Sequence, residues 1–261
     1  METALRQPDI ADVFERALVP AIFAPYARDL IERIRPIGPA DRILDLGCGT
    51  GIVARLLRER LGGAAAITGI DLSAPMIGKA RELAPELDWQ VGDAAALPFR
   101  DRAFDIVVCQ QMLQFAPDRD AVLREVRRVL SPGGRFVVSV WGARREQPLH
   151  DAIAAVAERH LGPSRDRRFS LAGAELRERL IAAGFADLRL VRVTLTEHHR
   201  ELPIRPSLGA LGFALDDVSP SQYAAIAADI DAALAQYRTA DGFAAPSSTT
   251  VVVARLPEEL P

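Results

Sequence analysis

Short runs of apolar, often β-branched residues alternate along this chain with amphipathic segments of helical spacing, and this alternation restricts the possible folds more than any other feature. Continuous apolar runs are typical of strands buried on both faces of a sheet, and a helix usually connects two parallel strands. Strands are expected at residues 42–46, 66–70, 87–91, 104–109 and 135–141, and helices at residues 52–61, 74–84 and 120–130. The sequence therefore predicts an α/β protein with a doubly wound, mostly parallel sheet.

After residue 141 the alternation of apolar runs and amphipathic segments becomes less regular. Helices are expected at residues 149–161 and 172–183, and two further strands at residues 188–195 and 249–255. The stretch between these strands, residues 196–248, is far longer than a hairpin needs, and such long connections are usually lids or binding elements. The predicted organisation is an N-terminal helical segment (1–40), a core (41–141) and a remainder (142–261) with helical lid insertions at about 146–170 and 196–248.

Composition narrows the possible functions. Lys plus Arg number 32 and Asp plus Glu number 35, and their spacing gives no basic stripe for a nucleic-acid partner. Lys79 is the only lysine, which argues against a Schiff-base or pyridoxal enzyme. Cys48 and Cys109 are too few for a disulfide framework or a structural zinc site, so no metal is expected. The N-terminus lacks a signal-peptide core and no apolar run is as long as a membrane span, so a cytoplasmic location is expected.

The most informative motif is DLGCGTG at residues 45–51, where a strand end passes through glycines into a helix. Glycines let the backbone turn sharply and approach a nucleotide-type cofactor closely. The dinucleotide fingerprint G-x-G-x-x-G does not fit, because the third glycine comes one position early and Ile52 takes its place. The Asp45 carboxylate would repel a pyrophosphate but suits an ammonium or sulfonium group. The predicted cofactor is therefore S-adenosylmethionine, which has a cationic amino-acid end and no phosphate, rather than NAD.

Two further acids end the next two strands of the expected sheet. Asp71 is placed to accept hydrogen bonds from ribose hydroxyls, and Asp93 to accept one from the exocyclic amine of adenine. Met76 and Leu97 are apolar residues close enough in sequence to flank the adenine ring. Ligands of such sheets bind at the carboxyl ends of the strands, so three acids beside a glycine loop predict one cofactor site.

Several longer strings share an order that is typical of one family. They are ILDLGCGTG (43–51), GIDLS (69–73), GDAAALPF (92–99), FDIVVCQQMLQF (104–115) and REVRRVLSPGGRFVVSVW (124–141). As a set they resemble the class I S-adenosylmethionine-dependent methyltransferases, specifically the small-molecule branch that includes the quinone-biosynthesis methyltransferases. The resemblance implies a seven-stranded sheet whose last strand is antiparallel, a methionine carboxylate near Gly47, and cofactor contacts from Gln110 and Gln111. Many relatives carry His where Gln114 and Phe115 stand here, so no histidine-assisted role is carried over to that point.

The predicted cofactor-binding residues are Asp45, Gly47, Cys48, Gly49, Gly51, Asp71, Leu72, Met76, Asp93, Ala94, Gln110 and Gln111. Methyl transfer is an in-line displacement on an activated methyl group, so a base is needed only where the nucleophile arrives protonated. Candidate bases are His150, His198, His199 and Glu197, and no catalytic residue is assigned among them. Adjacent His198 and His199 point to opposite faces of an extended strand, so only one of them is expected to face a pocket.

The substrate pocket is expected to be apolar. Its predicted lining is Tyr26, Met112, Phe115, Trp141 and Phe213, covered by the N-terminal helix and the 196–248 insertion as a lid that excludes water. Phe14 and Phe23 are expected instead to pack their helix onto the sheet.

The predicted function is in-line methyl transfer from S-adenosylmethionine to a small, largely apolar metabolite. The alternative is a protein that binds S-adenosylmethionine or S-adenosylhomocysteine without methyl transfer, as a regulator or as a scaffold for another reaction. The sequence leaves the substrate, the methylated atom and the oligomeric state open.

Overall fold

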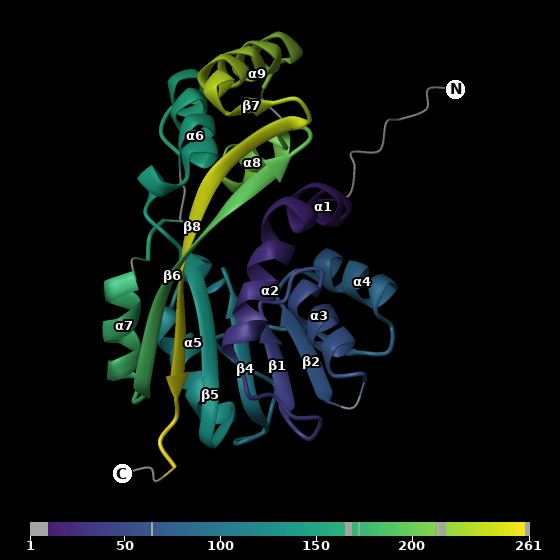
Figure 1. Cartoon of the computed structure of the whole chain (residues 1–261), viewed down its shortest axis with the longest axis vertical. Coiled ribbons are helices and arrows are strands. Elements are labelled where there is room, and N and C mark those ends of the chain that lie inside the picture. The colour runs from purple at the N-terminus through teal and green to yellow at the C-terminus, as the bar shows by residue number, and fades with distance from the viewer. Residues whose placement is uncertain are drawn as a thin grey trace.

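Strands of this chain form one twisted sheet, shown in Figure 1. The computed structural model describes residues 10–63, 65–164, 169–171, 173–211, 213 and 218–258. Within them the strands are β1 (Arg42–Leu46), β2 (Ala66–Asp71), β3 (Asp88–Val91), β4 (Phe104–Gln110), β5 (Leu130–Trp141), β6 (Ala186–His199), β7 (Arg238–Thr239) and β8 (Gly242–Arg255). Their order is β3-β2-β1-β4-β5-β8-β6, and the two-residue β7 pairs with β8.

Strands β1 to β5 are parallel, whereas β8 is antiparallel to both β5 and β6. The predicted doubly wound, mostly parallel sheet is therefore confirmed, with eight strands among the described residues instead of the expected seven, because the two-residue β7 adds to the edge of β8. The antiparallel last strand that the resemblance implied is also present.

Helical segments are α1 (Ile10–Val13), the π-helical η1 (Phe14–Phe23), α2 (Ala24–Arg33), α3 (Ile52–Arg60), α4 (Ala74–Leu83), η2 (Leu113–Phe115), α5 (Arg119–Val129), η3 (Arg144–Glu146), α6 (Pro148–Leu161), α7 (Gly173–Ala182), α8 (Ile204–Ala210), α9 (Pro220–Ala233) and η4 (Ala235–Tyr237). Local signals explain several boundaries. The Ser73 side chain accepts a hydrogen bond from the Met76 amide at the start of α4, and Asp118 caps α5 in the same way through the Ala121 amide.

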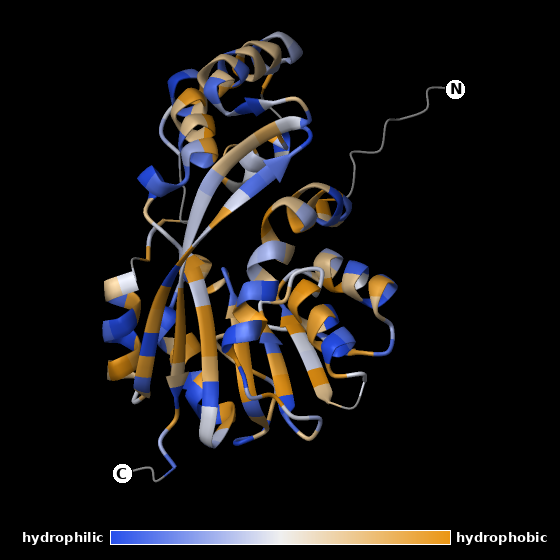
Figure 2. Cartoon of the chain, viewed as in Figure 1, coloured by the Kyte–Doolittle hydropathy of each residue, from blue (hydrophilic) through white to orange (hydrophobic). Residues whose placement is uncertain are grey.

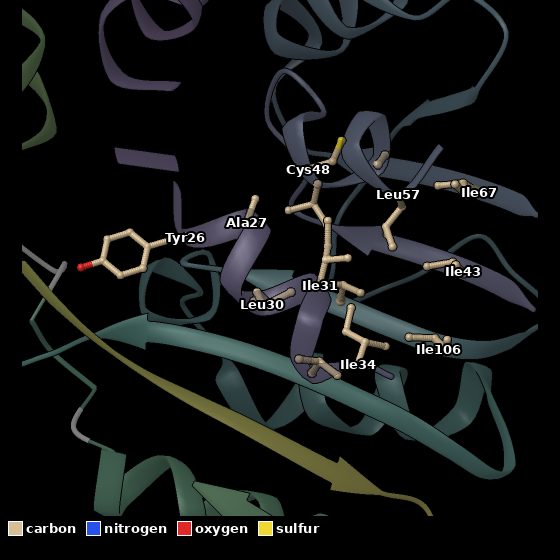
Figure 3. Packing of buried hydrophobic residues seen from close by; sticks show 14 of the residues in the cluster. Tyr26, Ala27, Leu30, Ile31, Ile34, Ile43, Cys48, Leu57, Ile67 and Ile106 are labelled. Atoms are coloured by element: carbon tan, nitrogen blue, oxygen red, sulfur yellow. The ribbon is translucent and has the colours of Figure 1, made fainter. Parts of the chain in front are cut away.

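Both faces of the sheet are buried, as continuous apolar strands require (Figure 2). Consecutive side chains point to opposite faces, so Ile43 belongs to the cluster under α2, α3 and α4, whereas Leu44 belongs to the cluster under α5 and α7. Figure 3 shows Ile31 of α2, and Ile34 directly after that helix, in the same cluster as Ile43 and Ile106 of the strands. Helix α2 therefore covers the centre of the sheet.

Residues 131–134 separate the predicted helix at 120–130 from the predicted strand at 135–141, but in the structure they do not form a separate connection. They lie within β5, and the β4–β5 register jumps from Phe104 opposite Leu130 to Ile106 opposite Arg135. Gly133 has a φ of +73°, so the extra residues form an irregularity inside the strand. Strand β5 therefore begins at Leu130, five residues before the predicted start at residue 135.

The β6–β8 hairpin is longer than predicted at its outer end. Pairing continues through Thr196 opposite Pro246 to His199 opposite Phe243, so the predicted strand ends at residues 195 and 249 are wrong. The β6 arm of this outer part, Thr196 to His199, is polar, and the β8 arm, Phe243 to Pro246, has no β-branched residue, so neither carries an apolar strand pattern. The hairpin rises beyond the parallel strands toward α6, α8 and α9 (Figure 1).

Helices α6, α8 and α9 share a separate apolar cluster with the outer end of β8. Ile153, Leu208 and Ile226, one from each helix, are buried in this cluster together with Phe243. We call the three helices and the outer hairpin the cap. Residues 1–9 of the expected N-terminal segment lie outside the described residues. So do residues 165–168, 172, 212 and 214–217 of the expected lid insertions and helices.

Candidate functional site

A cavity of about 620 Å³ opens at the carboxyl ends of four neighbouring strands. Asp45 of β1, Asp71 of β2, Gln110 of β4 and Trp141 of β5 all line it. The glycine loop after β1 forms one wall, and residues of η1, α6 and α8 contribute others. This is the position at which ligands bind in sheets of this type.

Glycine is required at two positions of the loop after β1, because each has a positive φ and no room for a Cβ atom. Gly47 has a φ of +68° and a Cβ there would lie 2.3 Å from the Met112 Cγ, so only glycine fits at the cavity wall. Gly51 has a φ of +83° and a Cβ there would lie 2.2 Å from the Trp89 ring. Gly47, Cys48 and Gly49 line the cavity, whereas Gly51 faces Trp89 and is not among the lining residues.

Asp45 and Asp71 both line the cavity and also accept backbone hydrogen bonds, Asp45 from α3 and Asp71 from the glycine loop. Asp45 is 1% exposed, and its Oδ2 accepts a hydrogen bond from the Ala54 amide at 3.0 Å. Burial raises the pKa of the Asp45 carboxyl to about 7, and the negative charge of Asp71 adds to the shift. Asp71 accepts hydrogen bonds from the Gly49 amide at 2.8 Å and the Ser73 amide at 2.9 Å.

Two glutamines, one at the end of β4 and one directly after it, present polar groups to the cavity. The Gln110 Nε2 donates to the Phe23 carbonyl at 2.9 Å, and its Oε1 has no hydrogen-bond partner among the described residues. Gln111 is 4% exposed, and both of its amide atoms lack a hydrogen-bond partner within the same described set. Its φ of +53° is unusual for a residue with a side chain. Buried, unsatisfied amides at a cavity fit a polar ligand that supplies the missing partners.

Three other residues predicted to bind the cofactor do not line the cavity. Leu72 is 73% exposed. Asp93 is exposed and its Oδ1 accepts a hydrogen bond from the Ala95 amide at 2.9 Å, which is a turn within its own loop. Ala94 packs at the edge of the α5 cluster. Met76, in contrast, lines the cavity as expected.

The apolar half of the cavity is formed largely by the N-terminal helices. Phe14 and Phe23 of η1 stack with ring centroids 4.7 Å apart, and both line the cavity with Leu18 and Ile22. The expectation that these two phenylalanines only pack onto the sheet is wrong. Helical periodicity identifies an apolar stripe, but it does not show whether a protein core or a cavity faces that stripe.

Of the predicted substrate-pocket residues, Met112, Phe115 and Trp141 line the cavity. Tyr26 and Phe213 do not. The buried Tyr26 hydroxyl donates to the Ser247 carbonyl at 2.5 Å, and burial raises its pKa to about 12. Figure 3 shows this hydroxyl pointing away from the helix to which Tyr26 belongs. Phe213 packs against the apolar cluster of the cap.

The N-terminal helices are held over the glycine loop by polar contacts that sequence reasoning missed. Glu15 accepts hydrogen bonds from the Thr50 hydroxyl at 2.5 Å and from the Arg55 guanidinium at 2.7 Å. Asp12 pairs with Lys79 of α4 at 2.6 Å. These contacts join residues far apart in the chain, so no local sequence signal identifies them.

One buried cluster brings together three of the candidate bases. The Glu197 Oε2 lies 3.4 Å from the His150 Nε2 and 3.2 Å from the His199 Nε2. Burial alone raises the pKa of the Glu197 carboxyl. The neighbouring His150 and His199 imidazoles and the Ser247 side chain outweigh that effect and hold the pKa well below its usual range. His198 is exposed and His199 is 5% exposed, as strand alternation predicts. Only His150 of the candidate histidines lines the cavity.

The described residues contain no group of three or more His, Cys, Asp or Glu side chains that could hold a metal ion. In the same part of the chain, every helix is too short or too polar to cross a membrane.

A family model described as a methyltransferase domain matches residues 44–138. The chain is 42% identical over 106 residues to a 2-phytyl-1,4-naphtoquinone methyltransferase from Synechococcus elongatus, covering 38% of this chain and 46% of that protein. It is 31% identical over 182 residues to a ubiquinone/menaquinone biosynthesis C-methyltransferase from Xylella fastidiosa, covering 66% of each. The chain spans about half the length of most of the curated relatives it matches.

A solved structure of similar architecture is phosphoethanolamine N-methyltransferase 2 from Haemonchus contortus in complex with S-adenosyl-L-methionine. It superposes with a TM-score of 0.60 at 21% identity, covering 95% of this chain and 60% of that one. At this identity the likeness shows a shared fold.

Proposed function

The chain contains a class I S-adenosylmethionine-dependent methyltransferase domain, and on this premise we propose that it methylates a small, largely apolar molecule. The observation that carries the proposal is a single cavity with two chemically different halves. One half presents Asp45, Asp71 and the amides of Gln110 and Gln111, and the other is lined by Phe14, Leu18, Trp141 and neighbouring apolar side chains.

The polar half suits the cofactor because its groups match the amino-acid end, the sulfonium charge and the ribose of S-adenosylmethionine. Asp45 in its ionised form pairs with the ammonium or sulfonium charge, and Asp71 accepts hydrogen bonds from hydroxyls of the ribose. The loop at Gly47 and Gly49 lets the backbone approach the amino-acid end closely. The bound cofactor supplies a methyl group that is already activated by a positively charged sulfur.

The apolar half suits the acceptor molecule. The cavity volume lies within the range of about 300–1,000 Å³ that is typical of small-molecule sites. The N-terminal helices cover it through Glu15, which leaves room for a metabolite rather than a folded protein or a nucleic acid. The quinone named for the Synechococcus elongatus relative is an apolar molecule of this kind. The chain's own contribution is then alignment of the two reactants and exclusion of water.

Two measurements test the proposal. Titration calorimetry with S-adenosylhomocysteine should show binding, and Asp71→Ala should weaken it. Incubation with S-adenosylmethionine labelled in its methyl group and a metabolite extract should then give a labelled small molecule. Binding without any labelled product would favour the alternative of a cofactor-binding protein that does not transfer methyl. Absence of binding, together with binding of NAD, would contradict the cofactor assignment itself.

A further inference from the structure

The cavity reaches the protein surface where its lining residues are exposed. Among the described residues these are Ile10 of α1, which is 54% exposed, Phe115 of η2, which is 41% exposed, and Gly209 of α8. The other described lining residues are buried or half-buried. The three exposed residues come from the N-terminal helices, the segment after β4 and the cap. The cap therefore takes part in the opening of the cavity as well as in its wall.

Helix α8 lies between the apolar interior of the cap and the cavity. Leu208 and the following Leu211 are fully buried in the cap cluster, whereas Ser207 and Gly209 line the cavity. Neighbouring residues of a helix point in different directions, so one side of α8 packs into the cap and another faces the cavity. The family model matches residues 44–138, so α8 belongs to a part of the chain that the model does not cover.

The wall that the cap contributes adjoins the apolar half of the cavity. The ring of His150 on α6 packs against Trp141 with centroids 5.3 Å apart, and both residues line the cavity. Helices α6 and α8 share the cap cluster, with Ile153 on the first helix and Leu208 on the second. Gly209 therefore lies in the wall on the side where the acceptor molecule is proposed to bind.

Gly209 leaves open space in this wall. A Cβ atom at this position would meet no heavy atom within 4 Å apart from its chain neighbours and the backbone of its own helix. Gly47 and Gly51 differ from it, because a Cβ there would clash. Glycine also weakens a helix relative to alanine, so neither packing nor local structure requires it in α8. The consequence of glycine here is the free space itself.

We infer that Gly209 is a specificity-determining residue, which sets the size of the largest acceptor molecule by leaving this edge of the cavity open. The inference rests on the proposed function. A larger side chain at this position takes up space that a long acceptor occupies, whereas a short acceptor does not reach it. Asp45 and Asp71 of the cofactor half lie on β1 and β2, so cofactor binding should not depend on residue 209.

A series of neutral probes of graded length tests the inference. The probes are 4-ethylphenol, 4-butylphenol, 4-hexylphenol and 4-octylphenol, which differ only in one apolar chain. Neutral probes suit the cavity because its described lining residues include no lysine or arginine to pair with an anion. Titration calorimetry of the wild type with S-adenosylhomocysteine bound should give a Kd that falls by up to about fourfold for each added methylene that is buried.

Gly209→Leu should remove this gain for the longest probes only. We expect its Kd to stay within about twofold of the wild type for 4-ethylphenol and to rise by about tenfold or more for 4-octylphenol, because the added side chain displaces the end of the longer chain. Gly209→Ala should give a smaller loss in the same direction. Both variants replace a glycine within a helix, so their thermal midpoints should be at least that of the wild type.

Gly78→Leu is the matched control. Gly78 also lies inside a helix, α4, and a Cβ there would likewise meet no heavy atom within 4 Å, but Gly78 is not among the residues that line the cavity. This variant should bind the whole probe series with the Kd values of the wild type.

The Kd for S-adenosylhomocysteine separates acceptor size from cofactor binding. It should agree within about twofold among the wild type and all three variants, because no glycine of the loop after β1 is changed. A weakening of cofactor binding in Gly209→Leu as large as its loss for 4-octylphenol would place residue 209 at the cofactor and overturn the inference.

The remaining outcomes distinguish the inference from the proposed function. Equal Kd values of the wild type and Gly209→Leu for every probe, or an equal loss for short and long probes, would show that residue 209 does not limit acceptor size. A wild type that binds S-adenosylhomocysteine but none of the four probes would also contradict the inference. In each of these cases a labelled small molecule from the metabolite extract leaves the proposed function standing. If no labelled molecule forms, the proposed function fails instead.

Discussion

Replacing Asp45 by asparagine should abolish a pH dependence of cofactor binding that follows from the burial of this carboxyl. Asp45 is 1% exposed and lines the cavity, and burial raises its pKa to about 7. Below that pH the carboxyl carries a proton in the free protein. A cationic ligand pairs only with the ionised form, so the proton must leave before the ligand binds.

The size of the effect follows from the pKa. If the bound ligand keeps Asp45 ionised, the apparent Kd rises by the factor 1 + 10^(pKa − pH). That factor is about 2 at pH 7 and about 33 at pH 5.5, so binding should be about sixteenfold weaker at pH 5.5, or about 1.6 kcal/mol. The sign is fixed by the direction of the shift: a raised carboxyl pKa makes affinity fall as pH falls. The ammonium group of the ligand stays charged throughout this range.

Titration calorimetry with S-adenosylhomocysteine between pH 5.5 and 7 measures the effect. This ligand keeps the ammonium group and has no methyl group to transfer. Asp45→Asn retains a side-chain oxygen that can accept the Ala54 amide hydrogen bond, but it cannot titrate, so its Kd should be nearly constant over the same range. A wild-type Kd that does not change with pH would refute the reasoning. An equal slope in the asparagine variant would place the titrating group elsewhere.

Three further variants test other parts of the site. Asp71→Ala should cost about 1.5–3 kcal/mol of affinity for S-adenosylhomocysteine, because a charged acceptor of hydrogen bonds is lost; an unchanged calorimetric Kd would reduce Asp71 to a support of the loop. Glu15→Gln should weaken the hold of the N-terminal helices on Thr50 and raise the rate at which labelled cofactor dissociates by several-fold, and an unchanged rate in stopped-flow measurements would show that these helices do not limit release. Gly51→Ala should lower the free energy of unfolding by about 1–3 kcal/mol, because its φ is +83° and a Cβ would meet Trp89 at 2.2 Å; urea unfolding at wild-type stability would contradict that account.

Much of the parallel sheet could be predicted from sequence because its signals are local. An apolar run such as residues 42–46 identifies a strand wherever the strand is placed, and a cap such as Ser73 needs only its own helix. Asp45 and Asp71 were placed correctly beside the cavity for a related reason. They lie at or next to the carboxyl ends of adjacent parallel strands, and parallel strands bring those ends together.

Tertiary structure alone decided the rest of the cavity. The outer part of β6, Thr196 to His199, carries a polar sequence, and its partner segment in β8 packs Phe243 against the helices of the cap. Tyr26, expected in the pocket, points instead to Ser247, and Phe14, expected in the core, lines the cavity.

The polar contacts around the cavity join segments that are distant in the chain. Glu15 meets Thr50 across 35 residues, and His150 meets Glu197 from a different layer of the molecule. Composition and spacing identify which residue types are available, and local patterns determine the strands and helices. Which side chains of separate elements come within hydrogen-bond distance depends on how those elements pack, because the free energy of each contact is gained only after the intervening chain has folded.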